Sequence, residues 1–375
     1  MNGKKRILLV ANSTWNIYNF RLNVIQKFID EGCEVVVLAP VDEFIKYKEQ
    51  FPEVRHYGIR SLSRNSTNPL REIVLVAELA RKFRKIKPDF IINYTHKPNI
   101  FGTLAARICG IKSIMVITGL GYLFIRQGIY QRIMFLLYKL SARYSSMLIF
   151  ENQDDRQLFI DEGITSVEKS VAVKGCGVNL EKFKSELPER LEKKSGIFAF
   201  IGRLLTDKGI NEYVEAAKIV KSRYPEVQFY VLGDFDEDNP ARIEREKLAE
   251  WVNEGLIDYR GFVHDVRPIL SQVDCLILPS YREGMPRIIM EAMSMGLAVI
   301  TTDTPGCRET VEDSFNGYLV PVANSEVLAE SIIRYLSLTP EEKQKMGRNS
   351  RTMAERYFDE KLIASIYHQI YKRLV

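Results

Sequence analysis

Two carboxylates in the second half of the chain, Glu283 and Glu291, stand eight positions apart. Eight positions are a little over two helical turns, so both side chains can lie on one face of a helix, one at its start and one deeper. A lone charge on a helix is usually a solvated surface group, but apolar residues flank Glu291 and favour a partly buried carboxylate. Gly284 has no side chain and lets an anion approach backbone amides at the helix start. The pair therefore suggests a site for a polar, anionic ligand.

Two cations, Arg203 and Lys208, follow an apolar segment at residues 197–201 that predicts a buried strand. Gly202 permits close approach to the backbone, and a helix is expected to begin just after Lys208. Fixed positive charge combined with the amides of a helix start is what a diphosphate needs. We interpret the two cations as diphosphate ligands, and the alternative is that both are solvated loop residues.

Polar loops also follow two expected strands in the first half of the chain. The segment THKPN at residues 95–99 follows a strand expected at 89–94, and the Gly-rich segment TGLGY at 118–122 follows one expected at 113–117. Ligands bind at the carboxyl ends of parallel strands. A histidine there can orient or deprotonate a hydroxyl group of a substrate. The alternative for His96 is a structural loop histidine.

Strand and helix patterns alternate along the chain, which is typical of α/β domains with parallel sheets. In the first half we expect strands at residues 7–11, 34–39, 89–94 and 113–117, and helices at 20–30, 69–86 and 100–109. In the second half we expect strands at 171–174, 197–201, 227–233, 257–263, 275–278 and 297–301, and helices after 286 and at 362–374. The connecting loop at 12–19 lacks the GxGxxG fingerprint, which disfavours a dinucleotide-dependent oxidoreductase.

The length of 375 residues is enough for two domains, each with its own core. A Gly-containing break at 175–179 and a highly charged segment at 181–194 mark the linker between them. No apolar run reaches the roughly 18 residues of a membrane span. The basic start and its short apolar run are interpreted as a first strand and not as a signal peptide. The five cysteines are scattered, which fits a reducing cytoplasm and argues against a disulfide framework or a zinc site.

The net charge of +5 conceals an asymmetry between the two halves. Residues 1–180 contain 26 Lys and Arg against 16 Asp and Glu, and no carboxylate occurs between Phe90 and Phe150. A basic surface of this kind suggests an anionic partner, and no nucleic-acid-binding module is recognisable, so a membrane or a phosphate-bearing substrate is favoured. The segment 128–147 mixes cations with aromatic and aliphatic residues. It is either a helix at a membrane interface or a helix that covers the sheet.

The segment EGMPRIIME, at residues 283–291, resembles the Glu-x7-Glu signature of family 4 of the retaining glycosyltransferases, which have the two-domain GT-B fold. The linker segment GVNLEKF, at residues 177–183, is similar to that family's GVD-x-x-x-F, with Asn179 in place of Asp. The segments IYNFR, THKPN and ITGLGY resemble a narrower group, which includes the N-acetylgalactosaminyltransferases that act on diacetylbacillosaminyl-diphospho-undecaprenol. Many family members have a histidine after the strand that ends here at Ile117. This chain has TGLG there, so that histidine's role is not transferred.

The resemblance implies a GT-B fold, two Rossmann-like domains with parallel sheets facing across a cleft. An N-terminal acceptor-binding domain is expected at residues 1–178 and a C-terminal nucleotide-sugar-binding domain at 179–359, with the helix at 360–375 packing back on the first. Arg203, Lys208, Glu283 and His96 are the expected catalytic residues. The expected donor-binding residues are Gly202, Arg203, Lys208, Gly233, Phe262, Val263, Glu283, Gly284, Met285, Pro286 and Glu291. The expected acceptor-binding residues are Tyr18, Arg21, His96, Lys97, Gly119, Gly121 and Arg126.

The implied function is the transfer of an N-acetylhexosamine, with N-acetylgalactosamine (GalNAc) as the first candidate, from a UDP-sugar to a sugar on undecaprenyl diphosphate, with retention. No cofactor and no metal are expected, and the acidic run at 234–238 is interpreted as a solvated loop. The expected location is the inner face of the cell membrane, which the basic N-terminal domain would contact. Two alternatives remain open: a UDP-sugar 2-epimerase of the same fold, and a non-catalytic membrane-bound assembly protein.

Overall fold

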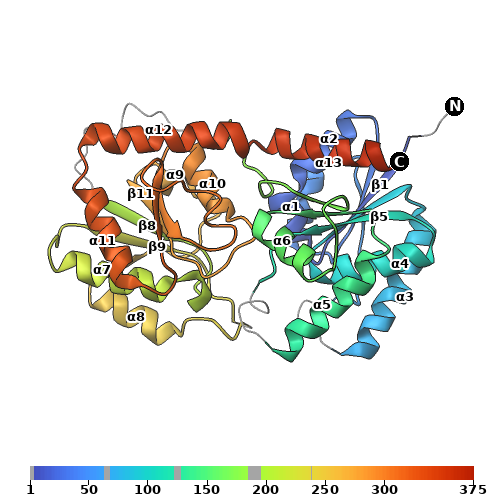
Figure 1. The fold of residues 1–375 in the computed structure, drawn as a ribbon, viewed down its shortest axis with the longest axis horizontal. Coiled ribbons are helices and arrows are strands. Elements are labelled where there is room, and N and C mark those ends of the chain that lie inside the picture. The colour runs from blue at the N-terminus through green and yellow to red at the C-terminus, as the bar shows by residue number, and fades with distance from the viewer. Residues whose placement is uncertain (1–3, 63–67, 122–127, 185–195, 238) are drawn as a thin grey trace. The chain divides into compact units, whose positions relative to one another are not determined.

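The computed structural model describes residues 4–62, 68–121, 128–184, 196–237 and 239–375. The chain divides into two compact units, Met1–Cys176 with Glu360–Val375 and Gly177–Asp359. Each unit is a parallel sheet covered by helices on both faces (Figure 1). The fold is therefore α/β with two Rossmann-like domains.

Unit 1 is built on seven parallel strands in the spatial order β3-β2-β1-β4-β5-β6-β7. The strands are β1 (Arg6–Val10), β2 (Glu34–Leu38), β3 (Arg55–Tyr57), β4 (Phe90–Tyr94), β5 (Lys112–Ile117), β6 (Met147–Phe150) and β7 (Ser170–Ala172). The order reverses between β1 and β4. The carboxyl ends of those two strands therefore flank the crevice where such sheets bind ligands.

The two faces of this sheet are covered by different helices (Figure 1). Along β1, Ile7 and Leu9 pack with α1 (Thr14–Phe20), α2 (Leu22–Asp30) and the chain's last helix, α13 (Glu360–Leu374). Leu8 and Val10 point the other way and pack with α3 (Pro69–Ile86) and α4 (Thr103–Ile108). The same second face continues under α5 (Ile129–Ala142) and α6 (Gln153–Asp161). This alternation is the two-residue period of a strand that is buried on both faces.

Unit 2 has six parallel strands in the order β10-β9-β8-β11-β12-β13. The strands are β8 (Ile197–Ile201), β9 (Gln228–Leu232), β10 (Asp258–Tyr259), β11 (Cys275–Leu278), β12 (Ala298–Thr302) and β13 (Gly317–Val320). The helices are α7 (Ile210–Lys221), α8 (Arg245–Asn253), α9 (Arg267–Leu270), α10 (Arg287–Ser294), α11 (Ser325–Leu336) and α12 (Pro340–Tyr357). Helix α7 packs against α11, and α10 packs against α12. Here the order reverses between β8 and β11.

Four local predictions from the sequence are wrong. The segment 95–99, expected as a polar loop, is helical from His96 on and runs into a π-helical turn, η2 (Pro98–Gly102). Most of the segment 12–19, expected as a loop, belongs to helix α1, because the Ser13 side chain caps it by accepting a hydrogen bond from the Asn16 amide at 3.2 Å. The helix expected at 128–147 ends at Ala142, and strand β6 begins at Met147. The strand expected at 257–263 is only the two residues of β10. Within the described residues, no helix combines the length and the hydropathy that a membrane crossing requires.

Candidate functional site

The strongest candidate site in unit 2 lies where the strand order reverses. The loops that follow β8 and β11 leave the carboxyl ends of neighbouring strands. In an open parallel sheet this is the place where ligands bind. The first loop carries Arg203 and Lys208, and the second carries Glu283, so the topology brings together residues that are some 75 positions apart in the sequence.

Backbone contacts fasten these two loops to each other. The carbonyl oxygen of Asp207 accepts hydrogen bonds from the Tyr281 amide at 2.9 Å and from the Ser280 hydroxyl at 3.1 Å. Gly209, just before α7, has φ +76°, and a Cβ there would lie 2.0 Å from the carbonyl oxygen of Pro279. Only glycine fits such a position, so residue 209 sets the distance between the two loops.

Lys208 and Glu283 form an ion pair across the two loops. Their side chains are 18% and 13% exposed, so the pair is shielded from solvent but can still be reached. The Ser280 hydroxyl also donates to Glu283 Oε1, at 2.9 Å, and the Glu283 amide donates to the Pro305 carbonyl at 3.1 Å. The carboxylate is thus held in place by a cation, a hydroxyl and its own backbone.

Arg203 points to the acidic loop that follows β9. Its Nη1 lies 2.5 Å from Asp236 Oδ2, and its side chain is 46% exposed. In the same loop, Glu237 pairs with Arg245. These carboxylates therefore neutralise neighbouring guanidinium groups. The described part of the chain holds no cluster of three or more His, Cys, Asp or Glu side chains arranged to hold a metal ion.

Glu291 lies on helix α10, with its side chain 12% exposed. Arg287, one turn earlier on the same helix, donates from Nε to Glu291 Oε1 at 2.8 Å. Burial raises the pKa of the Glu291 carboxyl, and the Arg287 guanidinium opposes that rise. Met285 is buried, and Pro286 occupies the N-cap position of α10 without a side-chain capping hydrogen bond. Gly284 lies in the half-buried loop before them.

The ends of β8, β9 and β10 approach one another through glycines. A Cβ on Gly233 would lie 1.8 Å from the carbonyl oxygen of Gly202, and the Tyr259 hydroxyl donates to the Gly233 carbonyl at 2.9 Å. Phe262 is 58% exposed and Val263 is half-buried, both in the loop after β10. This loop therefore presents an exposed aromatic ring at the same edge of the sheet as the two cations.

In unit 1, His96 follows β4 and is held from two sides. Its Nδ1 lies 2.8 Å from the Tyr138 hydroxyl of α5, and it makes a second hydrogen bond with the Leu120 backbone. Burial lowers the pKa of His96 to about 4, so the ring is neutral at physiological pH. The expected role in orienting or deprotonating the acceptor stays a prediction. The contacts also link the helical segment after β4 and the loop after β5 to α5.

Arg21 is placed differently from the expectation for a ligand of a lipid diphosphate. It is 2% exposed, and its Nη2 lies 3.0 Å from Glu151 Oε1, while its guanidinium carbon is 4.4 Å from the centre of the Tyr94 ring. Burial opposes the charge of Arg21, but the Glu151 carboxylate raises its pKa. The structure gives Arg21 the position of a buried ion-pair partner. Glu151 was missed by the sequence analysis, although it ends the carboxylate-free stretch.

The remaining acceptor candidates are spread around the same edge of unit 1. Lys97 Nζ lies 2.6 Å from Glu72 Oε1 of helix α3. The Tyr18 ring packs on Phe44, with 5.4 Å between ring centres. Gly119 and Gly121 lie in the loop after β5. Arg126 lies outside the described residues.

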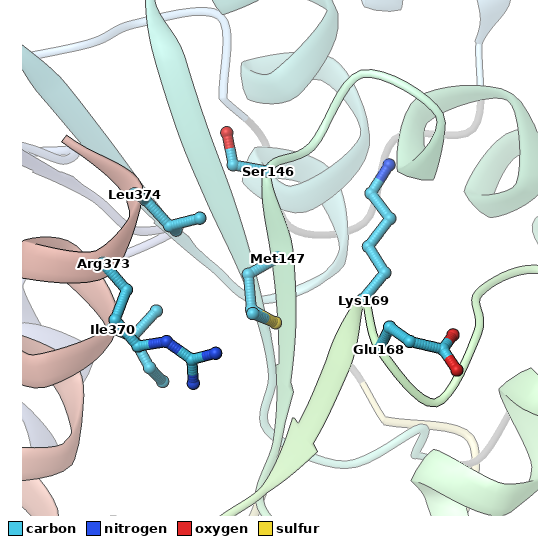
Figure 2. Close-up of a pocket in the computed structure, with 7 residues that line it drawn as sticks. All are labelled: Ser146, Met147, Glu168, Lys169, Ile370, Arg373 and Leu374. Atoms are coloured by element: carbon cyan, nitrogen blue, oxygen red, sulfur yellow. The ribbon is translucent and has the colours of Figure 1, made fainter.

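A hollow of about 330 Å³ in unit 1 lies at the opposite edge of the sheet, where β6 and β7 begin (Figure 2). Helix α13 contributes Ile370, Arg373 and Leu374 to it, and Lys169 at its rim donates to the Ala142 carbonyl at 2.8 Å. In open α/β sheets the active site lies outside the carboxyl ends of the strands. The hollow is therefore not a candidate active site.

Two family profiles match this chain. Residues 182–353 match the family described as "Glycosyl transferases group 1". Residues 6–152 match "Glycosyl transferase 4-like". The two matches fall in unit 2 and unit 1, respectively.

Two relatives match over three quarters of the chain or more. It is 30% identical, over 99% of both chains, to the N,N′-diacetylbacillosaminyl-diphospho-undecaprenol alpha-1,3-N-acetylgalactosaminyltransferase of Campylobacter jejuni. It is 28% identical, over 75% of this chain and 74% of the relative, to the UDP-Gal:alpha-D-GlcNAc-diphosphoundecaprenol alpha-1,3-galactosyltransferase of Escherichia coli.

Solved structures share the fold. A crystal structure of Anabaena HepE in complex with UDP and glucose is 20% identical with a TM-score of 0.80, over 98% of this chain and 99% of that one. A glycosyltransferase from Rickettsia africae is 20% identical with a TM-score of 0.78, over 99% of both chains. These structures support the fold assignment alone.

Proposed function

We propose a function for this chain from its family: it belongs to the glycosyltransferases, with a group 1 C-terminal domain and an N-terminal domain of the type called glycosyltransferase 4-like. On that basis it transfers an N-acetylhexosamine from a UDP-sugar to a sugar carried on undecaprenyl diphosphate. N-acetylgalactosamine is the first candidate for the sugar. The observation that carries the proposal is the likeness, over 99% of both chains, to an N-acetylgalactosaminyltransferase that is named for such a lipid-linked acceptor.

The donor occupies the switch point of unit 2 in this proposal. Glu291 accepts hydrogen bonds from the hydroxyls of the ribose, which its shielded, Arg287-supported carboxylate suits. The Phe262 ring flanks the base. The diphosphate lies against Lys208 and Arg203 and draws Arg203 from Asp236. A lysine ammonium has three N–H donors, so Lys208 can keep its ion pair with Glu283 while it donates a hydrogen bond to a phosphate oxygen.

The reaction needs charge stabilisation more than it needs a protein nucleophile. The bond between the anomeric carbon and the diphosphate oxygen breaks, and negative charge grows on the leaving UDP, where Arg203 and Lys208 stabilise it. The acceptor hydroxyl forms the new bond on the same face of the sugar and gives its proton to the leaving phosphate, so configuration is retained. Glu283 contacts the donor sugar and forms no covalent intermediate. The reaction requires no metal, because the two cations supply the neutralising charge.

Unit 1 receives the acceptor. The helical segment after β4, which begins with His96 and Lys97, and the loop after β5 lie at the carboxyl edge of its sheet and are suited to the sugar and the diphosphate. Because an undecaprenyl chain anchors the acceptor in the bilayer, the protein works at the inner face of the cell membrane. The basic N-terminal half of the chain would contact that membrane.

The test is UDP release by the purified protein. UDP-, GDP- and dTDP-sugars are each supplied with and without a sugar on undecaprenyl diphosphate, in the presence of EDTA. We expect UDP release from a UDP-N-acetylhexosamine only when the acceptor is present. Release without acceptor, or an isomerised donor, would instead indicate an epimerase. Nucleotide binding without any turnover would indicate a non-catalytic protein.

A further inference from the structure

Helix α3 exposes apolar side chains on the face that points away from the core. Leu70, Ile73 and Val74 are 72%, 66% and 59% exposed, and Ala77 continues this stripe at the spacing of successive helical turns. Its opposite face, with Leu79 among others, is fully buried in the sheet core. A solvent-facing stripe of this kind is not required by the fold.

A groove of about 530 Å³ runs beside this stripe. Ile73, Ala77 and Ala80 of α3 and Ile108 of α4 give it apolar walls, and Ile108 is 57% exposed. Arg81 and Arg84 line it further along α3. The groove thus combines an apolar wall with two guanidinium groups at one end.

Helix α5 repeats the pattern. Ile129, Ile133, Leu136 and Leu140 are 64%, 47%, 68% and 44% exposed and follow one another at helical spacing. Exposed cations at 132, 139 and 143 alternate with them on the same face. The inner face of α5 packs into the core through Tyr138. The inner face of α5 therefore covers the sheet, and its outer face is exposed.

Carboxylates are missing from these outer faces. Helices α4 and α5 contain none. The two on α3 both have partners: Glu72 pairs with Lys97 at 2.6 Å, and Glu78 accepts hydrogen bonds from the Ser61 backbone and hydroxyl. Both of these carboxylates are only partly exposed, and the exposed charged residues of the three helices are all Arg or Lys.

The three helices form one layer. Helix α3 packs on α4 and α4 packs on α5, on the same face of the unit 1 sheet (Figure 1). They are 18, 6 and 14 residues long, yet they carry eight of the nineteen large apolar side chains that are exposed among the described residues. Exposed apolar groups concentrated this strongly indicate an interaction surface. We call the outer faces of these helices the α3–α5 surface.

We propose that the α3–α5 surface docks on a bilayer rich in anionic phospholipid. Its aliphatic side chains enter the headgroup region, and its Arg and Lys side chains bind the phosphates, which is how an amphipathic interfacial helix binds. A protein partner would have to offer a surface that is both apolar and acidic, whereas an anionic leaflet supplies both properties everywhere. The inference specifies the membrane contact of the proposed function, but it depends on the exposure and charge of these helices alone.

The test is flotation of the full-length protein with vesicles of pure phosphatidylcholine and of phosphatidylcholine with phosphatidylglycerol. We expect binding to the anionic vesicles that weakens with added salt. The variant Ile73→Ser/Leu136→Ser should bind about tenfold more weakly or worse, because it loses two insertable side chains. Arg132→Glu/Arg143→Glu should show a similar loss. The matched control Val252→Ser, which alters an exposed apolar residue of unit 2, should bind like the wild type.

Circular dichroism and turnover of a short-chain, water-soluble acceptor separate the possible failures. Variants that keep the fold and this turnover but no longer bind the vesicles would support the proposal that the α3–α5 surface binds the membrane. Unchanged vesicle binding by both double variants, or equal binding to neutral vesicles, would overturn it. A wild-type dimer that the variants lose, without vesicle binding, would assign the surface to self-association. If the wild type turns over no acceptor, the proposed function fails, and the vesicle result still decides the surface.

Discussion

Replacing Arg21 by Met should destabilise unit 1 strongly, because it leaves a buried carboxylate without its partner. The Arg21 and Glu151 side chains are 2% and 6% exposed. Removal of one member of a buried ion pair typically costs about 3–5 kcal/mol. In a domain of this size, 1 kcal/mol shifts the melting temperature by about 2–4 °C. We therefore expect the transition of unit 1 to fall by roughly 6–20 °C in scanning calorimetry.

The penalty should depend on pH, with a sign that follows from Glu151. Burial raises the pKa of this carboxyl, and Arg21 opposes the rise. Without Arg21 the folded-state pKa rises further above the unfolded value, so folding favours the protonated acid. The loss of stability is therefore absent below the pKa that Glu151 has in the unfolded chain. It is complete above the pKa that Glu151 has in the folded variant. Arg21→Met should thus be closer to the wild type at pH 5 than at pH 8.

The control is the double variant Arg21→Met/Glu151→Leu, which removes both charges and fills a similar volume. Its stability should return to within about 1–2 kcal/mol of the wild type, since a buried pair contributes little net stability. A single variant as stable as the wild type, or a double variant as unstable as the single, would refute this account of the pair. If the double variant is stable but its acceptor KM is raised, Arg21 also binds the acceptor.

Three further predictions concern catalysis. Lys208→Met should lower kcat by about 10²–10³, because the charge on the leaving diphosphate loses its partner. The control Lys247→Met, which replaces an exposed lysine of the same unit, should leave kcat unchanged. Equal kcat values for the two variants would contradict this. Arg287→Gln should raise the donor KM more at pH 6 than at pH 8, because burial raises the pKa of Glu291 and the variant loses the cation that opposes this rise. Arg287→Lys should restore the pH profile of the wild type. A change in KM that does not depend on pH would contradict this prediction. EDTA should leave turnover unchanged, and a loss that Mg²⁺ or Mn²⁺ restores would show that a metal is needed.

The sequence predicted those parts of the fold that depend on local signals. The boundaries of α3 were predicted because Pro69 opens it, and those of β8 and β11 because short apolar runs end at polar loops. Helix α1 was missed because its seven residues, TWNIYNF, make only about two turns, which is too short for a helical period to show in the sequence. The alternation of strands and helices also predicted the parallel sheets, and the family resemblance supplied the GT-B class.

The candidate site was predictable only in part. Arg203, Lys208 and Glu283 were identified because each follows a strand end within a family motif. The ion-pair partners of other candidate residues were not predictable. Glu151 lies 130 positions from Arg21 in the sequence, and no local pattern connects the two. The same holds for Glu72, which lies 25 positions from Lys97. Sequence patterns indicate which strand ends carry chemistry, whereas the charge state of each side chain depends on tertiary packing.

The measurement that tests the central claim most directly is the structure of the product. The purified protein is incubated with UDP-N-acetylgalactosamine and a sugar on undecaprenyl diphosphate, and the lipid fraction is analysed by mass spectrometry and by the anomeric carbon–hydrogen coupling in NMR. We expect one added N-acetylhexosamine in alpha linkage, the configuration of the donor. A beta linkage would contradict retention, and an unmodified lipid beside an isomerised donor would contradict the transferase assignment itself.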